Sequence, residues 1–370
     1  MKAVRFHEHG GPEVLRYEEA PDPEVAAHEI LVRVRACALN HLDLWLRKGL
    51  PGVKVHLPHI CGADMAGEVA AVGAVCTRVK PGQRVVLMPA VSCGQCQACL
   101  SGRDNLCRHY QILGGYGPVD GGYAEYVKVP EVNAIPLADH LTFEAAAAVP
   151  LTFLTAWNML VALAGLQRGE DVLVIGAGSG VGAAAVQIAK LLGARVIATA
   201  GSEAKLAKAK ALGADHGINH ASQDIAAEVR TLTGKRGLDV VFEHVGEAVW
   251  GKCLAALTPG GRLVTCGATT GANAITDLRF VFSKQLSILG GYMGRKADLL
   301  ALWKFVESGE LKGVVDSTFP LKEAARQSST TFKAMGRACL MISTRRRLAS
   351  GSRCCSRKAM RPSSSREATS

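Results

Sequence analysis

Hydrophobic and polar residues alternate in short runs along the first 150 residues of the chain. The segment ILVRVRACA (30–38) alternates apolar and charged side chains with a period of two, which is typical of a half-buried strand. AGEVAAVGAV and GQRVVLM, separated by KPG, and the later GGYAEYVKVP predict further strands of the same sheet or barrel. Since this part has no long amphipathic helix pattern, we expect an irregular β-rich domain.

From about residue 143 the pattern changes to apolar strands that alternate with apolar helices. The helix-like FEAAAAVPLTFLTAWNMLVAL leads into a strand, a glycine-rich turn, an apolar helix, a second strand and a second helix. GLDVVFEHVG and GGRLVTCGA supply later strands at similar spacing. Strand–helix alternation of this kind requires parallel pairing with right-handed crossovers. The pattern therefore predicts an α/β fold in which a doubly wound parallel sheet follows the β-rich domain.

After about residue 283 we expect one more helix, KADLLALWKFVESGEL, and a short closing strand near GRACLMI. The segment 326–332, RQSSTTF, lacks the apolar helical pattern expected at that place.

Residues 145–167 carry no charge and are long enough to cross a bilayer. However, Pro150 interrupts this run, and Thr152, Thr155 and Asn158 are polar. A buried helix preceded by a turn explains the segment better, so we expect no membrane association.

The positive charge of the chain is concentrated at its C-terminal end. Residues 343–370 hold eight Arg and Lys but one acidic residue, which gives +7 of the total net charge of +11. Eight serines and almost no apolar pattern accompany this charge, so we expect a disordered tail. A basic arm can bind nucleic acid, but this one has no aromatic residue to stack on bases, so a nucleic-acid partner is not expected. An out-of-frame or extended terminus is the alternative.

The cysteine usage and the N-terminus predict a cytoplasmic protein. The start of the chain, MKAVRFHEHG, lacks the apolar core of a signal peptide. Eight of the twelve cysteines are scattered, several of them in apolar runs where free cysteine behaves as a small hydrophobic residue. This usage fits a reducing compartment.

The other four cysteines form the most specific motif of the chain, with the spacing C-x₂-C-x₂-C-x₇-C. Two-residue spacers let neighbouring thiolates reach the same tetrahedral Zn²⁺, and a site with four protein ligands leaves no position for catalysis. We therefore predict a structural zinc site. Four unrelated buried thiols and an iron–sulfur cluster are the alternatives. The predicted ligands are Cys93, Cys96, Cys99 and Cys107.

The segment VLVIGAGSGVG (172–182) places glycines where a strand passes into a helix. Such glycines permit a tight turn and let a pyrophosphate approach the free N–H groups of the helix N-terminus. A strand before, a helix after and a second strand about 20 residues later give the context that a dinucleotide site requires. A purely structural glycine turn is the alternative. The predicted cofactor residues are Gly178, Ser179, Gly180, Val181 and Gly182.

The end of the second strand predicts NADPH in preference to NADH. An NAD-specific site carries a carboxylate there, whereas this chain has Ala200 followed by Ser202 and Lys205. A hydroxyl and a cation would accommodate a 2′-phosphate. Glu203 is a nearby acid that argues against this prediction, and Lys205 could instead lie on a solvated helix face.

Together these motifs resemble the medium-chain dehydrogenase/reductase superfamily, which includes zinc alcohol dehydrogenases and quinone oxidoreductases. The resemblance implies one structural zinc per subunit and a homodimer or homotetramer that acts on a small-molecule substrate. It also implies a division of the chain, as follows: a GroES-like catalytic domain over 1–152 with its zinc lobe at about 90–110, a Rossmann domain over 153–282, a return to the catalytic domain over 283–342 and the tail 343–370.

The chain departs from the zinc alcohol dehydrogenases at their catalytic metal. Where they have a cysteine, ACALNHLD has Asn40, and their G-H-E motif is replaced by Gly62, Ala63 and Asp64. Their third ligand is a cysteine before the Rossmann domain, where VPLTFLTAW has none. In these segments the chain is similar to the quinone oxidoreductase branch, which works without catalytic zinc. A substitute metal set, drawn from His41, His59 or Cys61 with Asp64, is the alternative.

Without a Lewis acid to lower the pKa of a bound alcohol, alcohol oxidation should be poor. A quinone or an α,β-unsaturated carbonyl demands less, because NADPH gives hydride to an electron-poor carbon while hydrogen-bond donors stabilise the developing oxyanion. The family match makes Asn40 the first candidate donor. Asp43 would orient neighbours or relay a proton. Both could instead be turn or cap residues.

The resemblance also places residues of three further segments near the cofactor, and for His244 it supports proximity rather than proton donation. Two other functions stay open: a zinc alcohol dehydrogenase with an atypical metal site, and an NADPH-binding structural or RNA-binding protein. The further cofactor residues are Thr155, His244, Gly246, Cys266, Gly267, Ala268 and Thr269.

Overall fold

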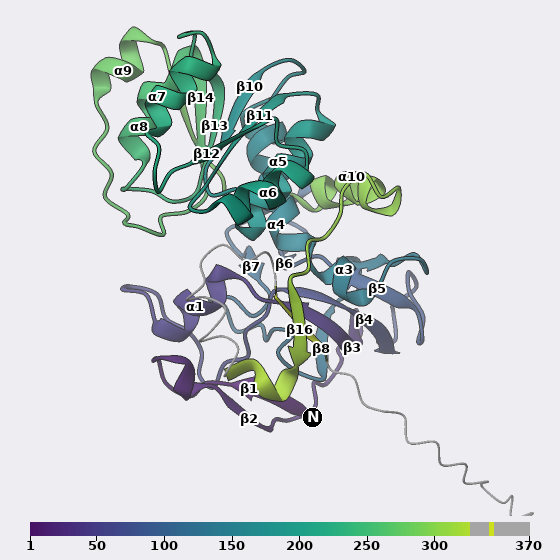
Figure 1. The fold of residues 1–370 in the computed structure, drawn as a ribbon. Coiled ribbons are helices and arrows are strands. Elements are labelled where there is room, and N and C mark those ends of the chain that lie inside the picture. Colours follow the sequence, from purple (N-terminus) through teal and green to yellow (C-terminus); the bar gives the residue numbers. More distant parts are fainter. Residues whose placement is uncertain (326–339, 344–370) are drawn as a thin grey trace, which may run out of the picture.

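The computed structural model describes residues 1–325 and 340–343, which form two lobes that lie one above the other in Figure 1. The expectations about residues 326–332 and about the basic tail fall outside the described residues, except that Ser343 ends the last strand.

The lower lobe is built on a seven-stranded sheet in the order β16-β17-β3-β4-β5-β9, with β8 also paired to β3. Two-stranded ribbons, β1 with β2 and β6 with β7, extend it. The strands are β1 (Lys2–Arg5), β2 (Arg16–Glu19), β3 (Glu29–Ala38), β4 (Asp64–Val72), β5 (Arg84–Leu87), β6 (Ala90–Val91), β7 (Gln111–Ile112), β8 (Tyr126–Pro130), β9 (Ala134–Pro136), β16 (Ser317–Pro320) and β17 (Leu340–Ser343).

Short helices and 3-10 turns lie between the strands of this lobe in the sequence. They are α1 (His41–Lys48), α2 (Gln97–Leu100) and α3 (Phe143–Ala147), with 3-10 turns at Pro12–Val14, Asp104–Leu106, Glu131–Asn133 and Leu321–Glu323.

Strand β3 forms because its alternating pattern fits a sheet that is buried on one face. Ile30, Val32 and Val34 are fully buried, while Arg33 points to the exposed side. The closing strand β17 pairs antiparallel with β3 and parallel with β16, so the end of the described chain returns to the first lobe.

The upper lobe is a parallel six-stranded sheet in the order β12-β11-β10-β13-β14-β15, with helices packed against it (Figure 1). This order reverses at β10, as in a doubly wound fold. The strands are β10 (Asp171–Val174), β11 (Arg195–Ala200), β12 (His216–Asn219), β13 (Leu238–Glu243), β14 (Leu257–Thr265) and β15 (Ser287–Gly290), and the helices are α5 (Gly180–Leu191), α6 (Glu203–Ala211), α7 (Ile225–Leu232), α8 (Trp250–Ala256) and α9 (Leu278–Ser283).

The sixth strand corrects one expected boundary. The Rossmann domain was expected to end at residue 282, but β15 pairs in parallel with β14 and carries the sheet on to Gly290. The predicted fold class, a β-rich GroES-like domain with a parallel Rossmann sheet, is confirmed.

Two helices lie between the lobes: α4 (Pro150–Trp157) and α10 (Lys296–Glu307). Phe153 and Leu154 of α4 pack in one core cluster with Val174 of β10 and Leu302 of α10. The apolar segment 145–167 is divided between α3, α4 and a π-helical turn at Asn158–Leu163. Within the described ranges, no helix has both the length and the apolar character needed to span a bilayer.

Candidate active site and metal centre

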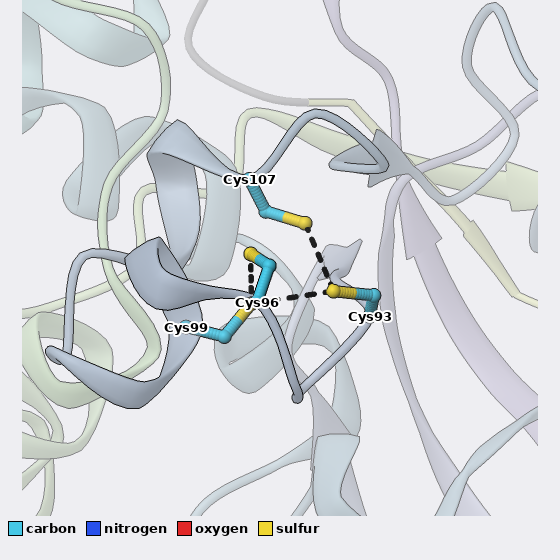
Figure 2. A group of neighbouring side chains, drawn as sticks. All are labelled: Cys93, Cys96, Cys99 and Cys107. Atoms are coloured by element: carbon cyan, nitrogen blue, oxygen red, sulfur yellow. Dashed lines mark hydrogen bonds between the residues drawn. The ribbon is translucent and has the colours of Figure 1, made fainter.

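The four cysteines of the motif converge in the lobe around α2 (Figure 2). The Sγ atoms of Cys93 and Cys107 lie 3.5 Å apart, those of Cys96 and Cys99 lie 3.6 Å apart, and those of Cys93 and Cys99 lie 3.9 Å apart. All four lie within 4.8 Å of one another. The backbone turns tightly here because Gly94 and Gly102 adopt positive φ angles.

This geometry fits a single tetrahedral ion. Zinc–sulfur bonds of about 2.3 Å in a tetrahedron separate the sulfurs by about 3.8 Å. A cluster of several irons would hold them further apart, because each thiolate then bonds a different iron. The backbone N–H of His109 donates to Sγ of Cys107 at 3.3 Å, and backbone N–H groups of Gln95 and Cys96 lower the pKa of Cys93.

The second site is a cleft between the two lobes. The lower lobe lines it with residues 39–42, Trp45 and Ile112, and α4 contributes Leu151, Thr152 and Thr155. The Rossmann lobe contributes the glycine turn, the ends of β11 and β13, and residues that follow β14 and β15. Its position at the carboxyl ends of parallel strands, where the strand order reverses, is typical of a nucleotide site.

The glycine turn joins β10 to α5 at the floor of this cleft. Ser179 caps α5, since its Oγ accepts the N–H of Gly182 at 3.0 Å, and Nε2 of His244 lies 3.2 Å from the same Oγ. A Cβ on Gly182 would lie 2.4 Å from the carbonyl oxygen of Gly176, so this position excludes a side chain. The first N–H groups of α5, before that of Gly182, have no acceptor within the helix, and such groups can bind an anion.

The far end of the cleft is lined by Ala200, Gly201, Lys205 and His220. His220 packs against Gly201, and its Nδ1 lies 3.4 Å from Oγ1 of Thr199. Burial and the charge of Lys205 both lower the pKa of His220.

Glu203, the acid that argued against NADPH, has a partner next to this end of the cleft. Its Oε1 accepts a hydrogen bond from the side-chain amide of Asn219 at 2.7 Å, and it does not line the cleft.

A buried polar pair lies under the lower-lobe side of the cleft. Nδ2 of Asn40 donates to Oδ2 of Asp64 at 2.9 Å, and the backbone N–H of Leu151 donates to Oδ1 of Asp64 at 2.7 Å. Asp64 is fully buried, and burial raises its pKa to about 7 against the opposing effect of these two hydrogen bonds.

Comparison with known proteins agrees with this geometry. The alcohol dehydrogenase GroES-like domain model matches residues 26–139, and the zinc-binding dehydrogenase model matches residues 180–308. Quinone oxidoreductase of Homo sapiens is 31% identical over 349 residues, which cover 92% of this chain and 97% of that protein. The chain belongs to the medium-chain dehydrogenase/reductase superfamily.

Two further relatives are named as dehydrogenases. The NAD-dependent alcohol dehydrogenase of Sulfurisphaera tokodaii is 32% identical over 353 residues, covering 92% of this chain and all of that protein (100%). A crystal structure of an NAD-dependent alcohol dehydrogenase is 48% identical, with a TM-score of 0.89, and covers 93% of this chain and 100% of that one. The predicted family is therefore confirmed, and the protein is an oxidoreductase of this superfamily.

At the sequence positions where zinc-dependent members bind the catalytic metal, this chain has different residues with other contacts. Asn40 and Asp64 are hydrogen-bonded to each other, and Ala63 between β3 and β4 offers no ligand atom. Among the described residues, the four cysteines of the lobe form the one cluster of three or more His, Cys, Asp or Glu suited to an ion. The substitute set does not converge, since His59 bonds the carbonyl of Gly114 at 3.1 Å.

The two candidate catalytic residues differ in position. Asn40 lines the cleft, although one amide N–H is directed at Asp64 rather than at the cleft. Asp43 does not line it: its Oδ2 accepts the backbone N–H of Asn40 and the hydroxyl of Tyr123, both at 2.7 Å. Asp43 thus occupies the third position of α1 and closes a capping box. This is the cap role that the sequence also allowed for Asp43.

Most of the expected cofactor residues line the cleft, and the others lie directly behind it. Ser202 precedes α6 as its N-cap, and Gly246 needs its positive φ of 90° and lies against Ala268. Gly182 lies in the first turn of α5. The residues that line the cleft are Thr155, Gly178, Ser179, Gly180, Val181, Lys205, His244, Cys266, Gly267 and Thr269.

Sequence reasoning missed the aromatic rim of the cleft. The ring of His41 meets that of Trp45 edge-on at 4.9 Å, and Tyr292 meets Tyr110 edge-on at 6.3 Å. His41 and Trp45 stand four residues apart on α1, a spacing that places two side chains on one helix face. That signal was available in the sequence, whereas the pairing of Tyr110 with Tyr292 depends on the tertiary fold.

Proposed function

We propose that this protein reduces quinones or α,β-unsaturated carbonyl compounds by hydride transfer from NADPH, with no metal ion taking part at the reacting carbon. The observation that carries the proposal is the Asn40–Asp64 hydrogen bond, which uses two of the positions that hold the catalytic metal in zinc-dependent members. The similarity to quinone oxidoreductase supports the same reading.

The cleft supplies what such a reaction requires. The reduced nicotinamide gives hydride to a carbon that is already electron-poor through conjugation, so no alkoxide has to be generated. The rings of Trp45 and Tyr292 fit a planar apolar acceptor. A second N–H of the Asn40 amide is available to the acceptor oxygen, where negative charge develops.

The adenosine end of the cleft supports NADPH. Lys205 brings a cation to this end, and the ring of His220 offers a nitrogen for a hydrogen bond to an added phosphate. Pairing with Asn219 directs the carboxylate of Glu203 toward β12.

A second candidate is an NAD-dependent alcohol dehydrogenase with an atypical metal site, which the 48% identical solved structure favours. This candidate predicts a lower KM for NADH than for NADPH, and turnover of a simple alcohol.

We also assign the four-cysteine lobe to one structural zinc per subunit, on the sulfur spacing and the match to the zinc-binding dehydrogenase model. Zinc there would hold the lobe in shape, since thiolates fill all four ligand positions.

For assembly we propose a homodimer that pairs through β15, with a homotetramer as the alternative. β15 is last in the order of its sheet, and its Ile288 is 39% exposed; Leu278 and Phe282 of α9 are also exposed, at 68% and 71%. Light scattering of the wild type and of the Ile288→Lys variant tests this, with a shift to monomer expected.

We also propose a cytoplasmic location, which the free thiols of the described cysteines support.

The deciding experiment is a panel of quinones, enones, aldehydes and alcohols assayed with NADPH and with NADH. The proposal expects turnover of 1,4-benzoquinone with NADPH and little oxidation of simple alcohols. A chain that ends at residue 343 should keep this activity, and loss of all turnover in that chain would favour a protein that works through its basic tail.

A further inference from the structure

Asp64 joins two elements that line the cleft, although it does not line the cleft itself. It is the first residue of β4 and has no exposed surface. One carboxylate oxygen bonds the side chain of Asn40, which immediately precedes α1, and the other bonds the backbone of Leu151, in the first turn of α4. A single carboxylate therefore fixes the starts of both helices.

These two helices carry the substrate side of the cleft. His41 and Trp45 come from α1, while Thr152 and Thr155 come from α4. A movement of either helix start would move these side chains against one another. The N-terminus of α4 also favours a negative charge at Asp64, because the N–H of Leu151 in its first turn donates to the carboxylate and the helix dipole has its positive end there.

The bond to Asp64 also decides which way the Asn40 amide faces. A carboxylate accepts hydrogen bonds and cannot donate one when ionised, so it selects the orientation with Nδ2 toward Asp64 and rejects the flipped amide. The amide nitrogen keeps a second hydrogen, and Asn40 lines the cleft.

We propose that Asp64 is a positioning residue for the reduction: in its ionised form it orients the Asn40 amide as a hydrogen-bond donor to the acceptor oxygen. This inference rests on the proposed function. It assigns to Asp64 an action through Asn40, without contact to substrate.

The arrangement makes this positioning depend on pH. Burial raises the pKa of Asp64 to about 7, the bonds from Asn40 and Leu151 oppose that rise, and the carboxylate of Asp43 adds to it. When Asp64 gains a proton it becomes a donor as well as an acceptor, and its hold on one amide orientation weakens. Turnover should therefore rise with pH between about 6 and 8.

A double-mutant cycle tests the proposal, with kcat measured for 1,4-benzoquinone and NADPH in Asn40→Ala, Asp64→Asn and the double variant. A hydrogen bond to a charged group is worth about 1.5–3 kcal/mol, so each single variant should lose about 10-fold in kcat with little change in the KM for NADPH. The double variant should be no slower than Asn40→Ala, because Asp64 acts through Asn40. The rising limb of kcat near pH 7 should vanish in all three variants.

Glu131→Gln is the matched control, since this buried carboxylate accepts backbone N–H groups of Arg78 and Val79 at 2.6 and 3.1 Å, away from the cleft. It should lose stability but keep the pH limb. The inference is overturned if the losses in kcat of the two single variants add in the double variant, or if the rise of kcat near pH 7 is unchanged in Asn40→Ala. In either case, quinone turnover by the wild type still upholds the proposed function. Absence of that turnover overturns the proposed function and this inference with it. The pH dependence of kcat in Asn40→Ala tests the inference even if Asp64→Asn fails to fold.

Discussion

The amide of Asn40 donates to the carboxylate of Asp64 at 2.9 Å, across 24 positions of sequence. The two residues stand where zinc-dependent relatives carry a metal ligand and its neighbouring acid, and here they satisfy each other. This pair is costly to break, because Asp64 is fully buried and one of its carboxylate oxygens would lose its hydrogen bond, leaving only the bond from Leu151. The Asn40–Asp64 hydrogen bond therefore holds Asn40 in place on the lower-lobe side of the cleft.

Substitution of Lys205 by Ala should raise the KM for NADPH about 10-fold, since a charge-assisted hydrogen bond to phosphate contributes about 1.5–3 kcal/mol. The KM for NADH should stay nearly constant, because NADH lacks the 2′-phosphate. Steady-state kinetics with both cofactors measure this. Lys208→Ala is the control, because Lys208 lies on the same helix and pairs with Asp316 at 3.1 Å. Equal changes for the two cofactors would argue against a phosphate at this end.

Substitution of Cys99 by Ser should remove the zinc and lower the Tm by several degrees, because a structural ion contributes its binding free energy to folding. Most of the quinone turnover of the folded protein should remain, since the four cysteines do not line the cleft. Metal analysis and thermal unfolding measure both effects. Cys76→Ser is the control: its Sγ bonds the carbonyl of Glu29 at 3.3 Å, outside the lobe. Unchanged zinc content in Cys99→Ser would refute the ligand assignment.

Asp43 and Asp64 should each lower the stability of the protein as pH rises from about 4 to 7, whereas the four histidines whose pKa burial lowers (His41, His59, His220 and His244) act in the opposite direction. In the folded state burial raises the pKa of Asp43 to about 6 and that of Asp64 to about 7, both from 3.8. In this window the unfolded chain has lost these protons and the folded chain retains them, so each group lowers the unfolding free energy by at most about 1.4 kcal/mol per pH unit.

Urea unfolding of the wild type and of Asp64→Asn at pH 5, 6, 7 and 8 measures this loss. The variant should lose less stability than the wild type between pH 5 and 8, and the two curves should become parallel only above about pH 8. Parallel curves over the whole range would contradict the pKa shift of Asp64.

Substitution of Trp45 by Ala should discriminate against large planar acceptors. The indole lies edge-on to His41 in the cleft, and losing an aromatic contact of this size costs about 10-fold in kcat/KM for a naphthoquinone. A small acyclic enone, which cannot reach across the cleft, serves as the control substrate and should be affected much less. Equal losses for the two substrates would place the acceptor elsewhere.

Local patterns made much of the fold predictable. The alternation over 30–38 gave strand β3, which runs Glu29–Ala38, and the cysteine spacing alone predicted a cluster that the fold does bring together. In contrast, β15 was missed: its four residues SILG are short, largely exposed and without alternation, so nothing local distinguishes them from a loop.

The cleft was less predictable, because its contacts join segments far apart in the chain. The pairing of Asn40 with Asp64 depends on the register of β3 against β4, and the bond to Leu151 depends on how α4 packs between the lobes. From the sequence Asp43 could be a relay or a cap; the local bond from the backbone N–H of Asn40 makes the cap, whereas the contact with the hydroxyl of Tyr123, 80 positions away, depends on the tertiary fold.

Zinc content measured together with quinone turnover tests the central claim most directly. Protein purified without chelators should hold about one zinc per subunit and reduce 1,4-benzoquinone with NADPH, and the zinc-free Cys99→Ser protein should still do so. Two zinc ions per subunit in the wild type, with the second ion and the activity lost together in Asp64→Asn, would contradict it.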